Sequence, residues 1–127
     1  MAIAPLPPTT WTGSKPEFAI FWALNQLGYI EGVDFTYQQA IAGGRMDYGG
    51  AILDFVFHLL SIAINVQSIR YHYERMETRQ HDEIIRVMVE GFGLKLIYID
   101  EEDALRNPIY YAQEALAGRD WSRMIGL

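Results

Sequence analysis

Two apolar runs stand back to back in residues 51–67, which read AILDFVFHLLSIAINVQ. Each run has the length of a strand, and polar residues interrupt both: Asp54 in the first, Asn65 and Gln67 in the second. A polar group at a buried strand position costs free energy unless it is hydrogen-bonded. These three residues are therefore the first candidates for a polar site.

Alternation along the two strands predicts which side chains lie together. Successive side chains of a strand point to opposite faces of the sheet. We therefore expect one face of each strand to hold these sets: Asp54, Val56 and His58 on the first, and Ala63, Asn65 and Gln67 on the second. If the strands are neighbours, the three polar side chains can converge.

Helix signals lie on both sides of this stretch. Ser14 followed three residues later by Glu17 forms a capping box, which predicts a helix that Gly28 ends. A second helix is predicted from Thr78 to about Glu90 by its apolar spacing. The residues that we expect it to turn inward are Ile84, Ile85, Met88, Val89 and Phe92.

The order of predicted elements defines the fold class. Strands are predicted at 35–41, 51–58, 61–67 and 94–99, and short helices follow from 100 and at 108–117. The first three strands have short connections, which favour an antiparallel meander, and the fourth follows a helix, which favours a parallel crossover. The prediction is an α/β fold: a mixed four-stranded sheet flanked by helices.

The two ends of the chain differ from this core. Residues 1–13 contain three prolines and predict an extended arm, because proline disfavours helix. We expect the arm to be pinned, either on its own domain through Trp11 or on a partner subunit. Residues 14–118 form the domain, and 119–127 form an apolar tail that is expected to dock through these residues: Trp121, Met124, Ile125 and Leu127.

Composition limits the classes of protein that the chain can represent. The chain has 127 residues, no cysteine and a net charge of −6. The lack of cysteine excludes disulfides and thiolate metal sites, and the acidic balance disfavours non-specific binding to nucleic acid. We find neither a signal peptide nor an apolar run near the roughly 18 residues of a membrane span. A cytoplasmic or virion protein is expected.

Several short motifs follow one another in a definite order between positions 15 and 105. They are Glu17, Asp54-Phe55, Asn65-Val66-Gln67-Ser68, Tyr71-His72-Tyr73, Asp82 with Arg86, Gly93, and a strand at 94–99 that ends in Asp100-Glu101-Glu102-Asp103. This order resembles the restriction-endonuclease-like PD-(D/E)xK superfamily, with a closer likeness to its very-short-patch-repair-type endonucleases.

The resemblance implies metal-assisted hydrolysis of DNA, in which carboxylates on two strands hold Mg²⁺. It implies Asp54 as a catalytic residue and metal ligand, with Glu17 contributing from the first helix. Asn65 and Gln67 occupy the positions of the third-strand motif, where amides replace charged groups. The expected site is therefore vestigial and needs no cofactor; Mg²⁺ is expected if the site is active.

Each of these residues also has a structural interpretation. Asp54 can be a buried carboxylate that the backbone or Arg45 satisfies. Asn65 and Gln67 can form a neutral polar network, which avoids the cost of burying charge. Glu17 can serve only as the capping-box residue.

A local basic cluster precedes the second predicted helix. Arg70, Arg75 and Arg79, together with His72, form either a weak nucleic-acid-binding site or an ordinary solvated approach to the helix. Asp82 and Arg86, four residues apart, can simply pair on the helix surface.

Three functions remain open. The first is a catalytically degenerate nuclease-fold protein that serves as a structural component of an assembly, for instance a phage head–tail or neck protein, with protein partners held through the arm and tail. The second is a metal-dependent endonuclease or nickase that uses Asp54 and Glu17. The third is a non-catalytic DNA-binding module that uses the cluster at 70–79. No membrane partner is expected.

Overall fold

Helices and strands follow one another in the predicted order. The computed structural model describes residues 2–41, 51–68 and 76–123, with the side chains of 51 and 76–82 left out. The elements are α1 (Lys15–Gln26), β1 (Thr36–Ile41), β2 (Ala51–Phe57), β3 (Ile62–Gln67), α3 (Met76–Gly91), β4 (Lys95–Asp100), α4 (Glu101–Arg106) and α5 (Pro108–Leu116).

The four strands form one mixed sheet in the order β1-β2-β3-β4. β1 pairs with β2, and β2 with β3, in antiparallel fashion, so these strands form the predicted meander. β4 joins β3 in parallel after the crossover through α3, with Ile64 opposite Ile97. The predicted fold class, α/β with a mixed four-stranded sheet flanked by helices, is confirmed.

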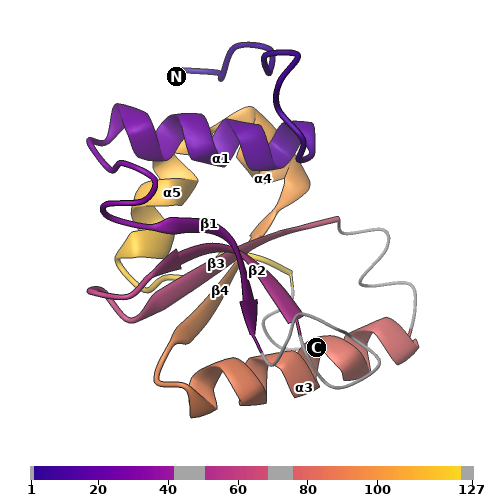
Figure 1. Cartoon of the computed structure of the whole chain (residues 1–127). Helices are drawn as coiled ribbons and strands as arrows, with labels where there is room; N and C mark the ends of the chain where they lie inside the picture. Colours follow the sequence, from indigo (N-terminus) through magenta and orange to yellow (C-terminus); the bar gives the residue numbers. More distant parts are fainter. Residues whose placement is uncertain (1, 42–50, 69–75, 124–127) are drawn as a thin grey trace.

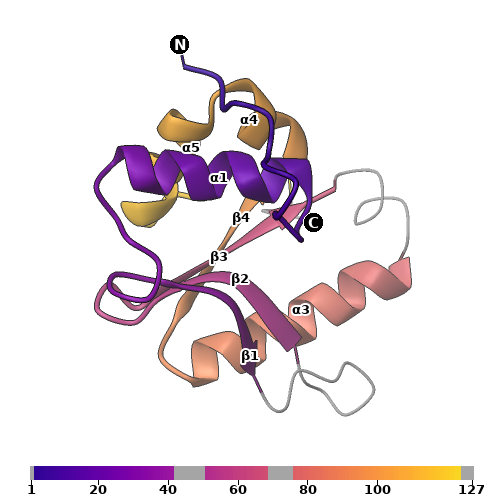
Figure 2. The ribbon, with the colours of Figure 1, turned by 45° about the horizontal axis from the view of Figure 1, so that its top comes forward.

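Helices cover both faces of the sheet (Figure 1). α1, α4 and α5 lie on one face and α3 lies on the other, an arrangement that persists in the rotated view (Figure 2). The core on the α1 side includes Leu24, Phe55 and Ile64. The core on the α3 side includes Val56 and Val89. Each face of the sheet is therefore buried against its own helices.

Ser14 caps α1 as the sequence predicts, and the Glu17 carboxylate binds the Ser14 hydroxyl in place of the backbone N–H of a full capping box. The backbone N–H of Glu17 donates to Ser14 Oγ at 3.2 Å, and Ser14 Oγ donates to Glu17 Oε2 at 2.9 Å. At the other end Gly28 has a φ of 94°, a conformation that glycine adopts without steric cost. Local sequence signals thus fix both ends of this helix.

α3 differs from its prediction in two respects. It begins at Met76, so Thr78 lies inside the helix and does not cap it. Ile85 and Val89 are buried as expected, but Ile84 and Phe92 are 61% and 64% exposed, so their predicted inward orientation is wrong. None of the helices in the described parts of the chain is long and apolar enough to cross a membrane.

The arm is held on its own domain by Trp11, one of the two alternatives that the sequence left open. The indole ring packs against Phe18 and Phe21, with ring centroids 5.1 and 5.2 Å apart, and its Nε1 donates to the Ser14 carbonyl. Nearer the N-terminus, Ile3 and Leu6 are 70% and 78% exposed.

The first residues of the tail attach to β4 through carboxylates. The backbone N–H of Tyr98 donates to Asp120 at 2.9 Å, and that of Arg123 donates to Asp100 at 3.0 Å. Trp121 is 57% exposed, and its Nε1 donates to Glu114 Oε1 on α5 at 2.9 Å. Docking of the tail on a partner stays a prediction. The expected contacts of Met124, Ile125 and Leu127 fall outside the described residues.

Candidate functional site

Side chains link β2 to β3 at Asp54 and Asn65. The described ladder between these strands runs from Phe57 opposite Ile62 to Phe55 opposite Ile64. At the next position the Asp54 N–H donates to Asn65 Oδ1 at 2.9 Å, and the Val66 N–H donates to Asp54 Oδ2 at 2.8 Å. The predicted convergence of Asp54 and Asn65 therefore occurs, and each side chain accepts a hydrogen bond from the opposite strand's backbone.

Gln67 lies further along β3. It is buried, and its Cα partner in the ladder with β4 is Asp100. The two hydrogen bonds that join Asp54 and Asn65 to the neighbouring backbone do not involve Gln67. The structure therefore brings together two of the three polar residues that the sequence singled out in these strands.

Glu17 approaches the same place from α1. Its Oε1 accepts a hydrogen bond from the Tyr37 hydroxyl at 2.7 Å and a longer one, of 3.4 Å, from the Gln38 amide. The other carboxylate oxygen accepts a hydrogen bond from the Ser14 hydroxyl in the cap of α1. Glu17 thus combines the two interpretations that the sequence offered: it caps α1 and it belongs to the carboxylate site.

The charge of Glu17 acts on Asp54. The pKa of Asp54 is raised from its ordinary value of 3.8 to about 7. Burial is the largest cause, and the charge of Glu17 adds to it. The hydrogen bond from the Val66 N–H acts in the opposite direction and lowers the pKa. Burial also raises the pKa of Tyr37, as do its hydrogen bond to Glu17 and the charges of Glu17 and Asp54. The site therefore favours a neutral Asp54 and a neutral Tyr37.

A backbone irregularity determines which side chains reach the site. In the β1–β2 ladder Tyr37 lies opposite Phe55 and Gln39 lies opposite Leu53, and Gln38 between them has a φ of 58°. Phe55 belongs to the core on the α1 side, whereas Leu53 belongs to the core on the α3 side. Residues two apart on β2 thus face opposite sides, so the alternation of a regular strand is broken here.

This break bears on one prediction about Asp54. Leu53 and Val56 pack on the α3 side of the sheet and Phe55 packs on the α1 side, so regular alternation does not extend through residue 54. The expectation that Asp54 shares a face with Val56 assumed that regularity and stays a prediction.

The arm closes over the site from above. The Trp11 ring lies 4.9 Å from the Tyr37 ring, centroid to centroid. A Cβ added to Gly13 would overlap the Tyr37 hydroxyl and would lie 3.2 Å from Glu17 Oε1. The chain can pass this close to Glu17 and Tyr37 because residue 13 has no side chain.

Sequence reasoning missed Tyr37 and Gln38 as members of the site. Both lie in a predicted strand, and neither belongs to a charged or metal-binding motif. Regular alternation would have placed Tyr37 and Gln39 on one face of the sheet. Nothing in the sequence pattern indicates that the two side chains lie on opposite faces. The hydrogen bond from Tyr37 to Glu17 depends on α1 crossing above β1, which is a tertiary feature.

The donor set is a poor fit for Mg²⁺. Asp54 and Glu17 supply two carboxylates, but the Asn65 amide oxygen is neutral and already accepts the Asp54 N–H. Within residues 2–41, 51–68 and 76–123, no group of three or more His, Cys, Asp or Glu side chains is placed to hold a metal ion. The raised pKa of Asp54 also opposes metal binding, because a ligand must lose its proton.

The predicted basic cluster stays a prediction. Arg70, His72 and Arg75 fall outside the described residues, as does Arg45, the alternative partner of Asp54. Arg79 lies in α3, and neither its side chain nor that of Asp82 is described. The partners of Arg86 include the Leu96 carbonyl at 3.2 Å and Asp120 at 3.8 Å.

Comparison of the chain with protein-family models, curated proteins and solved structures finds no match. The resemblance to PD-(D/E)xK endonucleases therefore rests on the residues that suggested it and remains a prediction.

Asp54→Asn is expected to flatten the dependence of stability on pH. The folded protein keeps the Asp54 proton up to about pH 7, whereas the unfolded chain releases it near its ordinary pKa of 3.8. The stabilisation is therefore complete below pH 4 and is lost as the pH rises to 7. If the whole pKa shift of Asp54 acted on stability, the free energy of unfolding would fall by about 4 kcal/mol over this pH range. Solvent screening at this half-buried group reduces the expected loss to about 2 kcal/mol.

The measurement is the free energy of unfolding in urea from pH 5 to pH 8. The amide oxygen of the substituted side chain can still accept a hydrogen bond from the Val66 N–H. As the pH rises, the free energy of unfolding of the variant should therefore increase relative to that of the wild type. The exposed Glu102→Gln serves as the control and should follow the wild type. Parallel curves for wild type and Asp54→Asn would show that the Asp54 pKa is not raised.

Gly13→Ala is expected to loosen the arm from the carboxylate site. The new methyl group would displace either the arm or the Tyr37 hydroxyl from Glu17, a loss of about 1–2 kcal/mol of the sort that overpacking causes. Urea unfolding and tryptophan fluorescence check this. Gly91→Ala is the matched control, since its Cβ would meet no atom within 4 Å. Equal stability of the two variants would contradict the close contact.

Proposed function

We propose that this protein is a catalytically degenerate, nuclease-fold structural protein that works as a component of a larger assembly, for instance a phage virion at the head–tail or neck region. The observation that supports a catalytically degenerate site is the hydrogen bonding of Asn65. It stands where the resemblance calls for a carboxylate, and its amide oxygen accepts the Asp54 N–H. A side chain that completes the sheet in this way serves the fold, and it gives a metal no charge.

The electrostatics of the carboxylate pair support the same proposal. A site that holds Mg²⁺ needs ionised carboxylates, because the cation prefers hard anionic oxygens. Here burial and the nearby Glu17 raise the pKa of Asp54 to about 7. The arm also packs over the site through Trp11 and Gly13, which limits the approach of a DNA phosphate to Glu17.

Exposed apolar side chains support the second half, the role in an assembly. Beyond its Trp11 anchor, the arm presents Ile3 and Leu6, both more than two thirds exposed. The turn between β2 and β3 presents Leu59, which is 92% exposed, and the α1–β1 connection presents Val33, which is 75% exposed. Exposed apolar groups of this size are typical of surfaces that partners cover, when they lie together in patches.

One observation favours a second candidate, a metal-dependent endonuclease or nickase. The carboxylates of Asp54 and Glu17 come from different elements and are close enough for one charge to raise the pKa of the other. A carboxyl group whose pKa is raised by burial and by a neighbouring carboxylate is a frequent feature of hydrolytic sites. Mg²⁺ would then be held by these two residues and by groups outside the described chain.

A nicking assay separates the two candidates. Supercoiled plasmid is incubated with the protein and Mg²⁺ or Mn²⁺, alongside Asp54→Ala and the exposed-site control Glu102→Gln. We expect no cleavage that depends on Asp54, because the site lacks the second strand carboxylate. Cleavage by wild type and Glu102→Gln that Asp54→Ala abolishes would establish the endonuclease and refute the degenerate site.

The assembly role predicts association that depends on the arm. Light scattering coupled to size-exclusion chromatography, at protein concentrations from about 10 µM to 1 mM, should give a mass above that of the monomer. The double variant Ile3→Ser/Leu6→Ser should shift the mass toward the monomer, because it removes the apolar surface of the arm.

The matched control is Ile84→Ser/Val87→Ser, which removes similar exposed apolar surface from α3 (61% and 66% exposed) and should leave the mass unchanged. A wild-type protein that stays monomeric at every concentration would count against association through the arm.

A further inference from the structure

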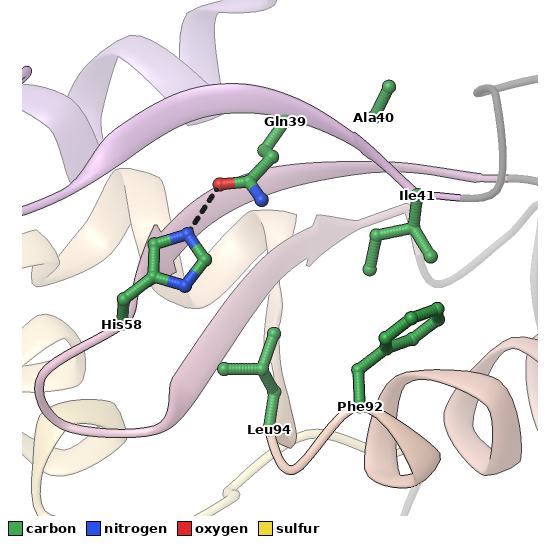
Figure 3. A pocket seen from close by; sticks show the side chains of 6 residues that line it. All are labelled: Gln39, Ala40, Ile41, His58, Phe92 and Leu94. Carbon is green, nitrogen blue, oxygen red and sulfur yellow. Dashed lines mark hydrogen bonds between the residues drawn. The ribbon is translucent and has the colours of Figure 1, made fainter.

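A pocket of about 260 Å³ opens on the α3 side of the sheet, away from the carboxylate site. β1, the turn after β2 and the turn between α3 and β4 supply its lining, shown in Figure 3: Gln39, Ala40, Ile41, His58, Phe92 and Leu94. Ile41 and Leu94 are almost completely buried, while Phe92 is 64% exposed and stands at the rim. The pocket thus has a fixed apolar floor and an open side.

We propose that this pocket binds a phenol-type group, a single aromatic ring that carries a hydroxyl. The inference does not depend on the function proposed above. It rests on three properties of the pocket: its size, its apolar floor and the hydrogen-bonding pair at its upper wall.

The volume selects a single ring. A dry apolar cavity of about 150 Å³ is large enough to take up benzene, and sites for drug-sized ligands start near 300 Å³. The 260 Å³ of this pocket therefore suit one substituted six-membered ring. Ile41 and Leu94 offer apolar surface on which such a ring can pack.

The polar pair selects the hydroxyl. His58 Nε2 and Gln39 Oε1 are 2.9 Å apart, and because an amide oxygen can only accept, the histidine nitrogen donates. In the neutral ring Nδ1 is then an acceptor. Figure 3 shows Nδ1 on the side of Leu94 and the Gln39 amide nitrogen turned toward Ile41. Among the described hydrogen bonds, none uses either of these two nitrogens.

Each of these two nitrogens complements a hydroxyl group. A phenol hydroxyl can both donate and accept, so it can donate to His58 Nδ1 or accept from the Gln39 amide. A ring without a hydroxyl would cover both nitrogens without replacing their hydrogen bonds to water, which costs free energy. The pocket should therefore prefer phenols over unsubstituted rings. Such a ring can come from a free small molecule or from a tyrosine side chain of a partner.

The test is a titration with p-cresol, which carries the ring and hydroxyl of tyrosine, against toluene, which lacks the hydroxyl. Binding is followed through the ¹³C-methyl NMR signals of Ile41 and Leu94. We expect p-cresol to shift both signals with saturation and to bind roughly three- to tenfold more tightly than toluene, the effect of one or two hydrogen bonds.

Variants connect the preference to the two polar residues. Gln39→Ala and His58→Ala should each lower the preference for p-cresol over toluene, because each removes one member of the hydrogen-bonded pair. Gln113→Ala, an exposed glutamine on α5 across the sheet, is the matched control and should preserve it. Circular dichroism checks that each variant is folded.

A second arm distinguishes the two sources. N-acetyl-tyrosinamide is titrated in the same way against N-acetyl-phenylalaninamide. Saturable shifts with the tyrosine compound support a partner side chain, whereas shifts with p-cresol alone support a free phenol. No shift of Ile41 or Leu94 up to about 20 mM p-cresol would overturn the proposal. Equal affinity for p-cresol and toluene in the wild type would overturn it too.

Discussion

Two hydrogen bonds between side chain and backbone hold β3 against β2 at the position next to the last described backbone pair of the two strands. Asp54 receives the Val66 N–H, and Asn65 receives the Asp54 N–H. The strands on either side depend on this contact, because β2 also carries β1 and β3 also carries β4. A polar pair in the middle of the sheet is tolerated because it accepts hydrogen bonds from backbone N–H groups that would otherwise be buried without a partner.

This contact also explains why an amide suits position 65. Asp54 lies near Glu17 and already has a raised pKa, so the site carries more negative charge than its surroundings favour. A carboxylate at 65 would place another acidic group beside Asp54 and Glu17 without a described cation to balance it, and a bound metal would be needed to keep all three ionised. Asn65 accepts the same hydrogen bond from Asp54 without adding charge. Fold stability and metal binding therefore place opposite demands on this position.

The sequence predicts the parts of this fold that local chemistry controls. Ser14 and Glu17 predict the start of α1, Gly28 predicts its end, and apolar runs predict the four strands, because capping and burial patterns are local properties. It predicts the meeting of Asp54 and Asn65 but not the break in alternation beside Asp54. The left-handed backbone of Gln38 is not encoded by a glycine or an asparagine, so alternation could not reveal the break.

That break gives β1 two roles. In a regular strand Tyr37 and Gln39 would lie on the same face, since they are two residues apart. Here Tyr37 donates to Glu17 on the α1 side, and Gln39 lines the pocket on the α3 side with His58. Restoring regular alternation would move one of them to the wrong face and would dismantle either the carboxylate site or the pocket. The left-handed conformation of one exposed residue, Gln38, therefore accompanies the placement of Tyr37 and Gln39, two residues apart, on opposite faces of the sheet.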